Sequence, residues 1–87
     1  MFRRSKPTLP AGLTLVTRRA CGLCEEALGA IGRVGVAGPV AIVDIAEHAE
    51  HAMFDERLPV LLDSASNVLA EGRITERQLR AIARSLV

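Results

Sequence analysis

The chain has 87 residues, about half of them apolar, with a net charge of +1 and neither Trp nor Tyr. This length supports one domain with a modest core, and the apolar content excludes a disordered chain. The basic excess lies in Arg3, Arg4 and Lys6, and without these three residues acidic side chains outnumber basic ones. That balance argues against a nucleic-acid-binding or membrane-surface role, so we expect neither kind of partner.

The first residues predict a tail rather than an export signal. Pro7 and Pro10 interrupt the stretch in which a signal peptide would place its apolar segment. No apolar run approaches the roughly 18 residues that cross a membrane. We therefore expect residues 1–11 to form a flexible basic tail, residues 12–87 to form the domain, and the protein to be cytoplasmic. In a reducing compartment, two closely spaced cysteines indicate redox or metal chemistry rather than a structural disulfide.

The apolar pattern of the first half predicts a strand, a helix and a second strand. Residues 13–17 alternate at first and are rich in β-branched side chains, which is typical of a strand. Residues 21–34 follow a helical spacing that ends before Gly35. Residues 40–45 are apolar almost throughout, as expected of a strand that is covered on both faces. Together they predict a right-handed βαβ unit. The inner stripe of the helix is expected to comprise Leu23, Ala27, Ala30, Ile31 and Val34.

The second half predicts a hairpin followed by a helix. Residues 46–55 indicate a short polar helix, and residues 59–62 and 68–71 indicate two strands joined by a turn rich in Asp, Ser and Asn. The final helix begins at Thr75, which we expect to form a capping box with Gln78. The predicted fold class is α/β, with a four-stranded mixed sheet flanked by helices in the order β-α-β-(α)-β-β-α.

The pair Cys21 and Cys24 carries the chemistry that the sequence predicts. Residues i and i+3 of a helix lie on one face with Cα atoms roughly 5 Å apart, a separation that a disulfide tolerates. The pair also lies where a strand gives way to a helix, so the helix dipole and free N–H groups are expected to lower the pKa of the Cys21 thiol. Arg18 and Arg19 add positive charge just upstream. We expect Cys21 to attack a substrate disulfide and the more buried Cys24 to resolve the mixed disulfide.

Two other interpretations of the cysteine pair stay open. One is a pair of buried cysteines that never react, and the other is half of a zinc site. Zinc takes four ligands, and the chain has no second C-x-x-C pair. His48 and His51 are the residues that could complete such a site, but they lie on a segment expected to be far from the start of the helix. We therefore expect no metal site.

The sequence around the cysteines resembles that of a known family. Residues 15–27, LVTRRACGLCEEA, are similar to the opening of small bacterial glutaredoxin-like proteins of the thioredoxin-fold superfamily. Residues 43–45 resemble the second strand of these proteins, and residues 57–61 resemble the segment that carries the cis-proline of the thioredoxin fold. Gly72, followed by a terminal helix, also fits. The resemblance covers residues 13–86 and implies a thioredoxin-like, glutaredoxin-like fold.

The resemblance also implies site residues and partners. Pro59 is implied to be cis and to pack beside the cysteine pair, which leaves the backbone of Leu58 free to pair with an extended substrate. Arg18 and Gly72 complete the expected substrate site. The implied function is a thiol–disulfide oxidoreductase that acts as a monomer on protein or low-molecular-weight disulfides, with a reductase or glutathione as electron donor.

Two departures from the family pattern limit what the resemblance implies. Gly22 and Leu23 stand between the cysteines where most glutaredoxins have Pro and Tyr. Before the last helix, only Gly72 matches the glycine-rich turn that holds glutathione. We expect no bound cofactor, with glutathione as a candidate co-substrate. The alternative function is a non-enzymatic thioredoxin-fold binding module, or a metal or iron–sulfur carrier that uses two such chains.

Overall fold

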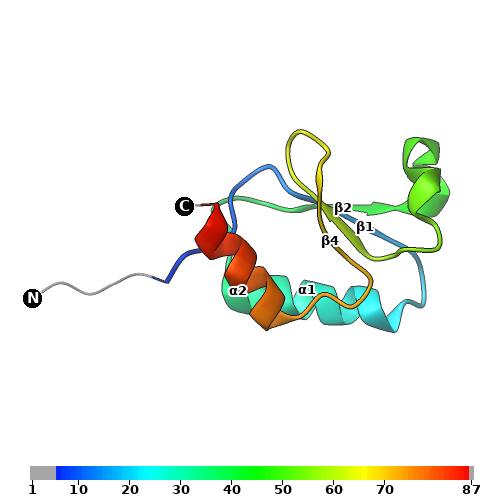
Figure 1. The fold of residues 1–87 in the computed structure, drawn as a ribbon. Coiled ribbons are helices and arrows are strands. Elements are labelled where there is room, and N and C mark those ends of the chain that lie inside the picture. The colour runs from blue at the N-terminus through cyan, green and yellow to red at the C-terminus, as the bar shows by residue number, and fades with distance from the viewer. Residues whose placement is uncertain (1–5, 87) are drawn as a thin grey trace, which may run out of the picture.

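The strands and helices follow one another along the chain in the predicted order (Figure 1). The computed structural model describes residues 6–86. The elements are strands β1 (Thr14–Thr17), β2 (Ala41–Asp44), β3 (Val60–Leu62) and β4 (Val68–Glu71) and helices α1 (Gly22–Val34) and α2 (Glu76–Ser85). Two short 3₁₀ helices, η1 (Ile45–Glu47) and η2 (Ala49–Phe54), stand where the sequence predicts one polar helix. Within residues 6–86, no helix is long and apolar enough to cross a membrane.

The four strands form one mixed sheet in the order β2-β1-β3-β4. Strands β1 and β2 are parallel and are connected through α1, which confirms the predicted βαβ unit. Strand β3 is antiparallel both to β1 and to β4, and the β3–β4 pair is the predicted hairpin. The predicted four-stranded mixed sheet with flanking helices is therefore confirmed.

Helices α1 and α2 lie on the same side of the sheet (Figure 1) and cover the main core. Because side chains alternate along a strand, Leu15 of β1 packs in this core while Val16 faces the other side of the sheet. That second side holds a smaller cluster formed by Val16, Phe54, Leu58, Val60 and Leu62. The inner stripe predicted for α1 is buried except at Leu23, which is half-buried.

Strand β2 is more exposed than its apolar sequence predicts. It lies at the edge of the sheet, where β1 is its neighbour, and Ile42 is 55% exposed. The expectation of a strand covered on both faces is wrong. The physical reason is that β2 is an edge strand and that the short 3₁₀ helices after it do not cover its surface. Ile42 pairs with Leu15 in the parallel ladder.

The segment before β1 contributes to the core at Leu9. Part of the expected flexible tail, residues 1–5, lies outside the described residues. Leu9 is fully buried, its N–H donates to the carbonyl of Gly35 at 2.8 Å, and its carbonyl accepts from Ala37 at 2.8 Å. The last residues of the expected tail are thus part of the fold. The sequence hides this because one apolar residue between prolines carries no periodic signal.

Helix α2 begins as predicted and is tied to α1 by charged side chains. Thr75 Oγ1 accepts a hydrogen bond from the N–H of Gln78 at 3.1 Å, which confirms Thr75 as the N-cap residue of the predicted capping box. The carboxylate of Glu76 accepts from Arg80 Nη2 at 2.7 Å and from Arg33 Nε of α1 at 2.8 Å. Hydrogen bonds from Arg80 and then Arg33 hold the pKa of Glu76 below its ordinary value.

This network predicts a pH-dependent contribution to stability. Glu76→Gln should lower the free energy of unfolding at neutral pH by a small amount, because exposed ion pairs contribute little. Since the pKa of Glu76 is lower in the folded state than its ordinary 4.5, its contribution is present above that pH and is lost as pH falls through the folded value. Urea unfolding at neutral pH and at about pH 3 should show the difference between the proteins shrinking.

Glu56→Gln is the matched control for this experiment. Glu56 is exposed and forms no ion pair within the described part of the chain. Its replacement should leave the free energy of unfolding nearly unchanged at either pH. A Glu76→Gln effect that grows on acidification would contradict the prediction.

Candidate redox site

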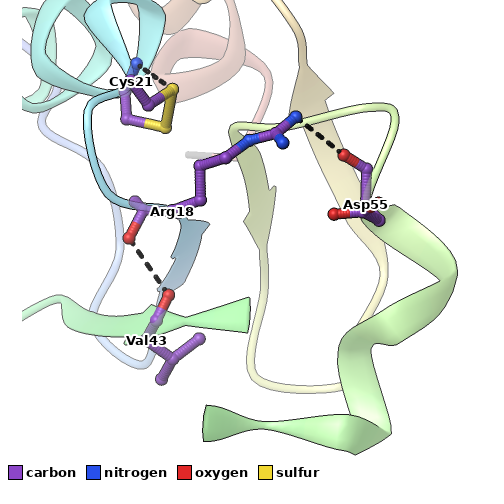
Figure 2. Close-up of a disulfide and its surroundings, with 6 residues drawn as sticks. Arg18, Cys21, Val43 and Asp55 are labelled. Atoms are coloured by element: carbon purple, nitrogen blue, oxygen red, sulfur yellow. Dashed lines mark hydrogen bonds between the residues drawn. A yellow bond between two sulfur atoms is a disulfide. The ribbon is translucent and has the colours of Figure 1, made fainter. Parts of the chain in front are cut away.

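The cysteine pair is placed by the start of helix α1. Cys21 is the N-cap residue, with an extended backbone, and Cys24 lies in the first turn of the helix. Their Cα atoms are 5.2 Å apart and their sulfurs form a disulfide (Figure 2). The N–H of Cys24 donates to Cys21 Sγ at 3.1 Å. The Cα separation of roughly 5 Å expected from the sequence is therefore confirmed. The sulfur of Cys21 accepts a hydrogen bond from one of the N–H groups that have no partner within the helix at its start.

The two cysteines differ in their access to solvent. Cys24 is 3% exposed and packs inward from α1, whereas Cys21 is half-buried. A substrate sulfur can therefore approach Cys21, while Cys24 is reached mainly through its partner. The predicted difference in burial between the two residues is confirmed.

A hollow of about 330 Å³ opens beside the disulfide. Its lining includes Thr17, Arg18, Cys21, Cys24, Glu25 and Leu28. The hydroxyl of Thr17 donates to the carbonyl of Val43 at 3.1 Å, which ties the end of β1 to β2 (Figure 2). The chain then turns sharply into α1 through Ala20, whose φ of 52° is uncommon for a residue other than glycine. Nothing in the sequence indicates this left-handed residue.

The segment before β3 comes to the same end of the sheet as the cysteines. The Leu58–Pro59 peptide bond is cis, as the resemblance implies, and both residues are buried. Val60 pairs with Val16 in the antiparallel ladder. Continuing that register by one residue brings Pro59 opposite Thr17, which lines the hollow beside the disulfide.

We call residues 55–59 the proline loop. Alternate carbonyl groups of this loop accept hydrogen bonds from distant parts of the chain. The N–H of Gly72 donates to the carbonyls of Arg57 at 3.1 Å and of Pro59 at 2.9 Å. Arg18 Nη2 donates to the carbonyl of Asp55 at 3.1 Å (Figure 2). Gly72 takes a φ of 70°, which favours glycine. Its amide is thus engaged within the chain, and its role in substrate binding stays a prediction.

The backbone of Leu58, beside the cis-proline, is left available in the proline loop. Within residues 6–86, neither its N–H nor its carbonyl makes a hydrogen bond to the backbone. A substrate in extended conformation could pair with these two groups as an added strand. The structure therefore places Cys21, Cys24, Arg18 and the Leu58–Pro59 segment, four of the features that the sequence singles out, at the same end of the sheet.

The histidines lie in and beside η2, and neither of them lines the hollow beside the disulfide. The rings of His48 and His51 are 6.3 Å apart, and Nδ1 of His48 lies 3.3 Å from the carboxylate of Glu50. Within the described residues, no group of three or more His, Cys, Asp or Glu side chains is arranged to hold a metal ion.

Sequence reasoning missed Asp55, because a backbone carbonyl that accepts a hydrogen bond from a distant arginine leaves no signal in the residue type.

The mixed sheet, the C-x-x-C disulfide at the first helix and the cis-proline before β3 define a protein of the thioredoxin-like fold. Residues 12–82 match the family model described as Glutaredoxin-like domain (DUF836), and the chain belongs to this family. The X-ray structure of the structural genomics target protein XcR50 from X. campestris is similar, with 30% sequence identity and a TM-score of 0.70. The match covers 85% of this chain and 97% of that one. No curated protein gave a match.

Proposed function

We propose that the protein is a thiol–disulfide oxidoreductase that works through Cys21 and Cys24. The observation that carries the proposal is the accessible Cys21 sulfur at the start of α1, bonded by the N–H of Cys24 and backed by the buried Cys24 sulfur. A helix start stabilises negative charge, so the same contact favours a thiolate at Cys21 once the pair is reduced. The family match supports a redox role.

The proposed reaction proceeds in two exchanges. The Cys21 thiolate attacks one sulfur of the substrate disulfide, the S–S bond breaks, and the other substrate sulfur leaves as a thiolate that takes up a proton. Cys24 then loses its proton and attacks Cys21 Sγ, which releases the second substrate thiol. The substrate gains two electrons and two protons, and the protein is left with the disulfide seen in the structure.

Substrate and electron donor are further parts of the proposal. We propose protein or low-molecular-weight disulfides as substrates of a cytoplasmic monomer, with a reductase or glutathione returning the pair to the dithiol. Glutathione can be tested directly by incubating the Cys24→Ser variant with oxidised glutathione. A glutathione adduct that forms on Cys21, detected by mass spectrometry, would support glutathione as co-substrate, whereas its absence would favour a reductase.

Trapping of the mixed disulfide tests the proposed order of attack. Cys24→Ser should accumulate a substrate adduct on Cys21, because the second exchange cannot occur. The chain has two cysteines, so the mass of the intact variant identifies the site. Cys21→Ser is the matched control and should react far more slowly, because Cys24 is 3% exposed. Equal adduct formation on the two variants would contradict the assignment.

A further inference from the structure

Arg18 links the two segments that flank the disulfide. It lies in the short loop between β1 and Cys21, and its side chain extends to the carbonyl of Asp55, 37 residues later, with a distance of 3.1 Å (Figure 2). Asp55 directly follows η2 and begins the proline loop. The bond therefore spans from the cysteine side of the site to the segment that carries Leu58 and Pro59.

The other hydrogen bonds between the proline loop and distant segments connect it mainly to the end of β4. Gly72, next to β4, binds the carbonyls of Arg57 and Pro59. The side chain of Arg57 pairs with Glu71, the last residue of β4. These contacts fix the proline loop relative to β4, and they do not set its distance from residues 18–21, the segment between β1 and α1. The hydrogen bond from Arg18 to Asp55 joins the proline loop directly to the segment before Cys21 and so sets the distance between them.

We propose that Arg18 is a positioning residue that holds the Leu58 backbone in register with Cys21 for substrates carried on an extended polypeptide. The proposal rests on the proposed function. Such a substrate would be held at two places, by pairing with the Leu58 backbone and by its sulfur at Cys21, so the spacing between the two segments matters. A small disulfide is held only near Cys21 and should depend much less on that spacing.

Arg19 allows this positioning role to be separated from a charge effect. It carries the same charge one residue closer to Cys21 and is exposed. Within residues 6–86, its side chain makes neither a hydrogen bond nor an ion pair. Arg18→Lys provides a second separation, because it keeps the charge but ends about one bond short of the guanidinium nitrogen that reaches Asp55.

The test compares Arg18→Ala, Arg18→Lys and Arg19→Ala with the wild-type protein, using dithiothreitol as electron donor. The substrates are an extended peptide with a disulfide-bonded leaving group and bis(2-hydroxyethyl) disulfide. Both Arg18 variants should raise KM for the peptide about tenfold, the effect of one lost hydrogen bond to a charged donor. Their kcat at saturating peptide and the redox potential of the cysteine pair should change little, and any loss of rate with the small disulfide should be several-fold smaller than the loss with the peptide. Arg19→Ala should match wild type throughout.

Each other outcome overturns the proposal. A lower KM for the peptide in Arg18→Ala would make Arg18 an obstruction in the substrate groove. Equal losses with both substrates, or the same loss in Arg19→Ala, would show that charge near Cys21 is what matters. A wild-type protein that reduces neither substrate would instead contradict the proposed function. If Arg18→Ala lowers the unfolding temperature, Arg18→Lys, checked in the same way, carries the comparison.

Discussion

Replacement of Cys21 by serine is expected to abolish disulfide reduction, with a fall in rate of more than about 10³-fold. A thiolate is the attacking group in disulfide exchange, and a serine hydroxyl stays protonated at neutral pH and forms no S–S bond. Cys21 is half-buried whereas Cys24 is 3% exposed, so we expect a substrate to reach Cys21 first. The rate is measured as peptide disulfide reduced per minute with dithiothreitol as donor, after subtraction of the uncatalysed reaction.

The Cys21→Ser variant is expected to remain folded, which makes its loss of activity interpretable. Serine is a favoured N-cap residue, and its hydroxyl can accept the N–H bond that Cys24 now donates to sulfur. Circular dichroism of the variant and of the reduced wild-type protein should therefore agree. Turnover that survives in a folded Cys21→Ser protein would contradict the assignment of Cys21 as the nucleophile.

Leu9→Ala is expected to lower the free energy of unfolding by about 2–4 kcal/mol, as for other fully buried leucines that are truncated. Leu9 is completely buried and packs against the core beneath α1 and α2. Truncation to alanine removes that apolar contact and leaves a cavity, because the backbone bonds to Gly35 and Ala37 keep the segment in place. Urea unfolding of the wild-type and variant proteins under reducing conditions measures the difference.

Thr8→Ala is the control for the Leu9 experiment. Thr8 is the adjacent residue and is exposed, so its replacement should change the free energy of unfolding by less than about 0.5 kcal/mol. If Leu9→Ala had an effect equally small, Leu9 would behave as part of a flexible tail. Such a result would restore the domain boundary that the sequence predicts between residues 11 and 12.

The elements that the sequence predicts correctly depend on neighbouring residues. The helical spacing after Cys21, the turn formers between β3 and β4, and the capping interaction of Thr75 with Gln78 are all local signals. The cysteine pair belongs to the same group, because two residues in one helical turn come close whatever the rest of the chain does. The difference in burial between the two cysteines followed from the direction of the helix.

The features that the sequence does not show depend on the arrangement of distant segments. The exposure of Ile42 follows from the edge position of β2, which no property of the strand itself reveals. The burial of Leu9 requires Gly35 and Ala37 to be in place beyond α1. The bond from Arg18 to Asp55 joins an exposed arginine to a backbone carbonyl, a combination with no residue pattern. Resemblance to a family, rather than physical reasoning, indicated the cis bond at Pro59.

Gly22 is one of the two residues between the cysteines, and its backbone is unusually free to move once the disulfide opens. It is the first residue of α1, and a Cβ atom added there would meet no other atom within 4 Å. Packing therefore does not require glycine at this position. Glycine has more accessible backbone conformations than any other residue, so we expect the first turn of α1 to gain disorder in the dithiol form that the cross-link suppresses. The balance between disulfide and dithiol thus includes the conformational entropy of a single helical turn, which one substitution at Gly22 would alter without touching either sulfur.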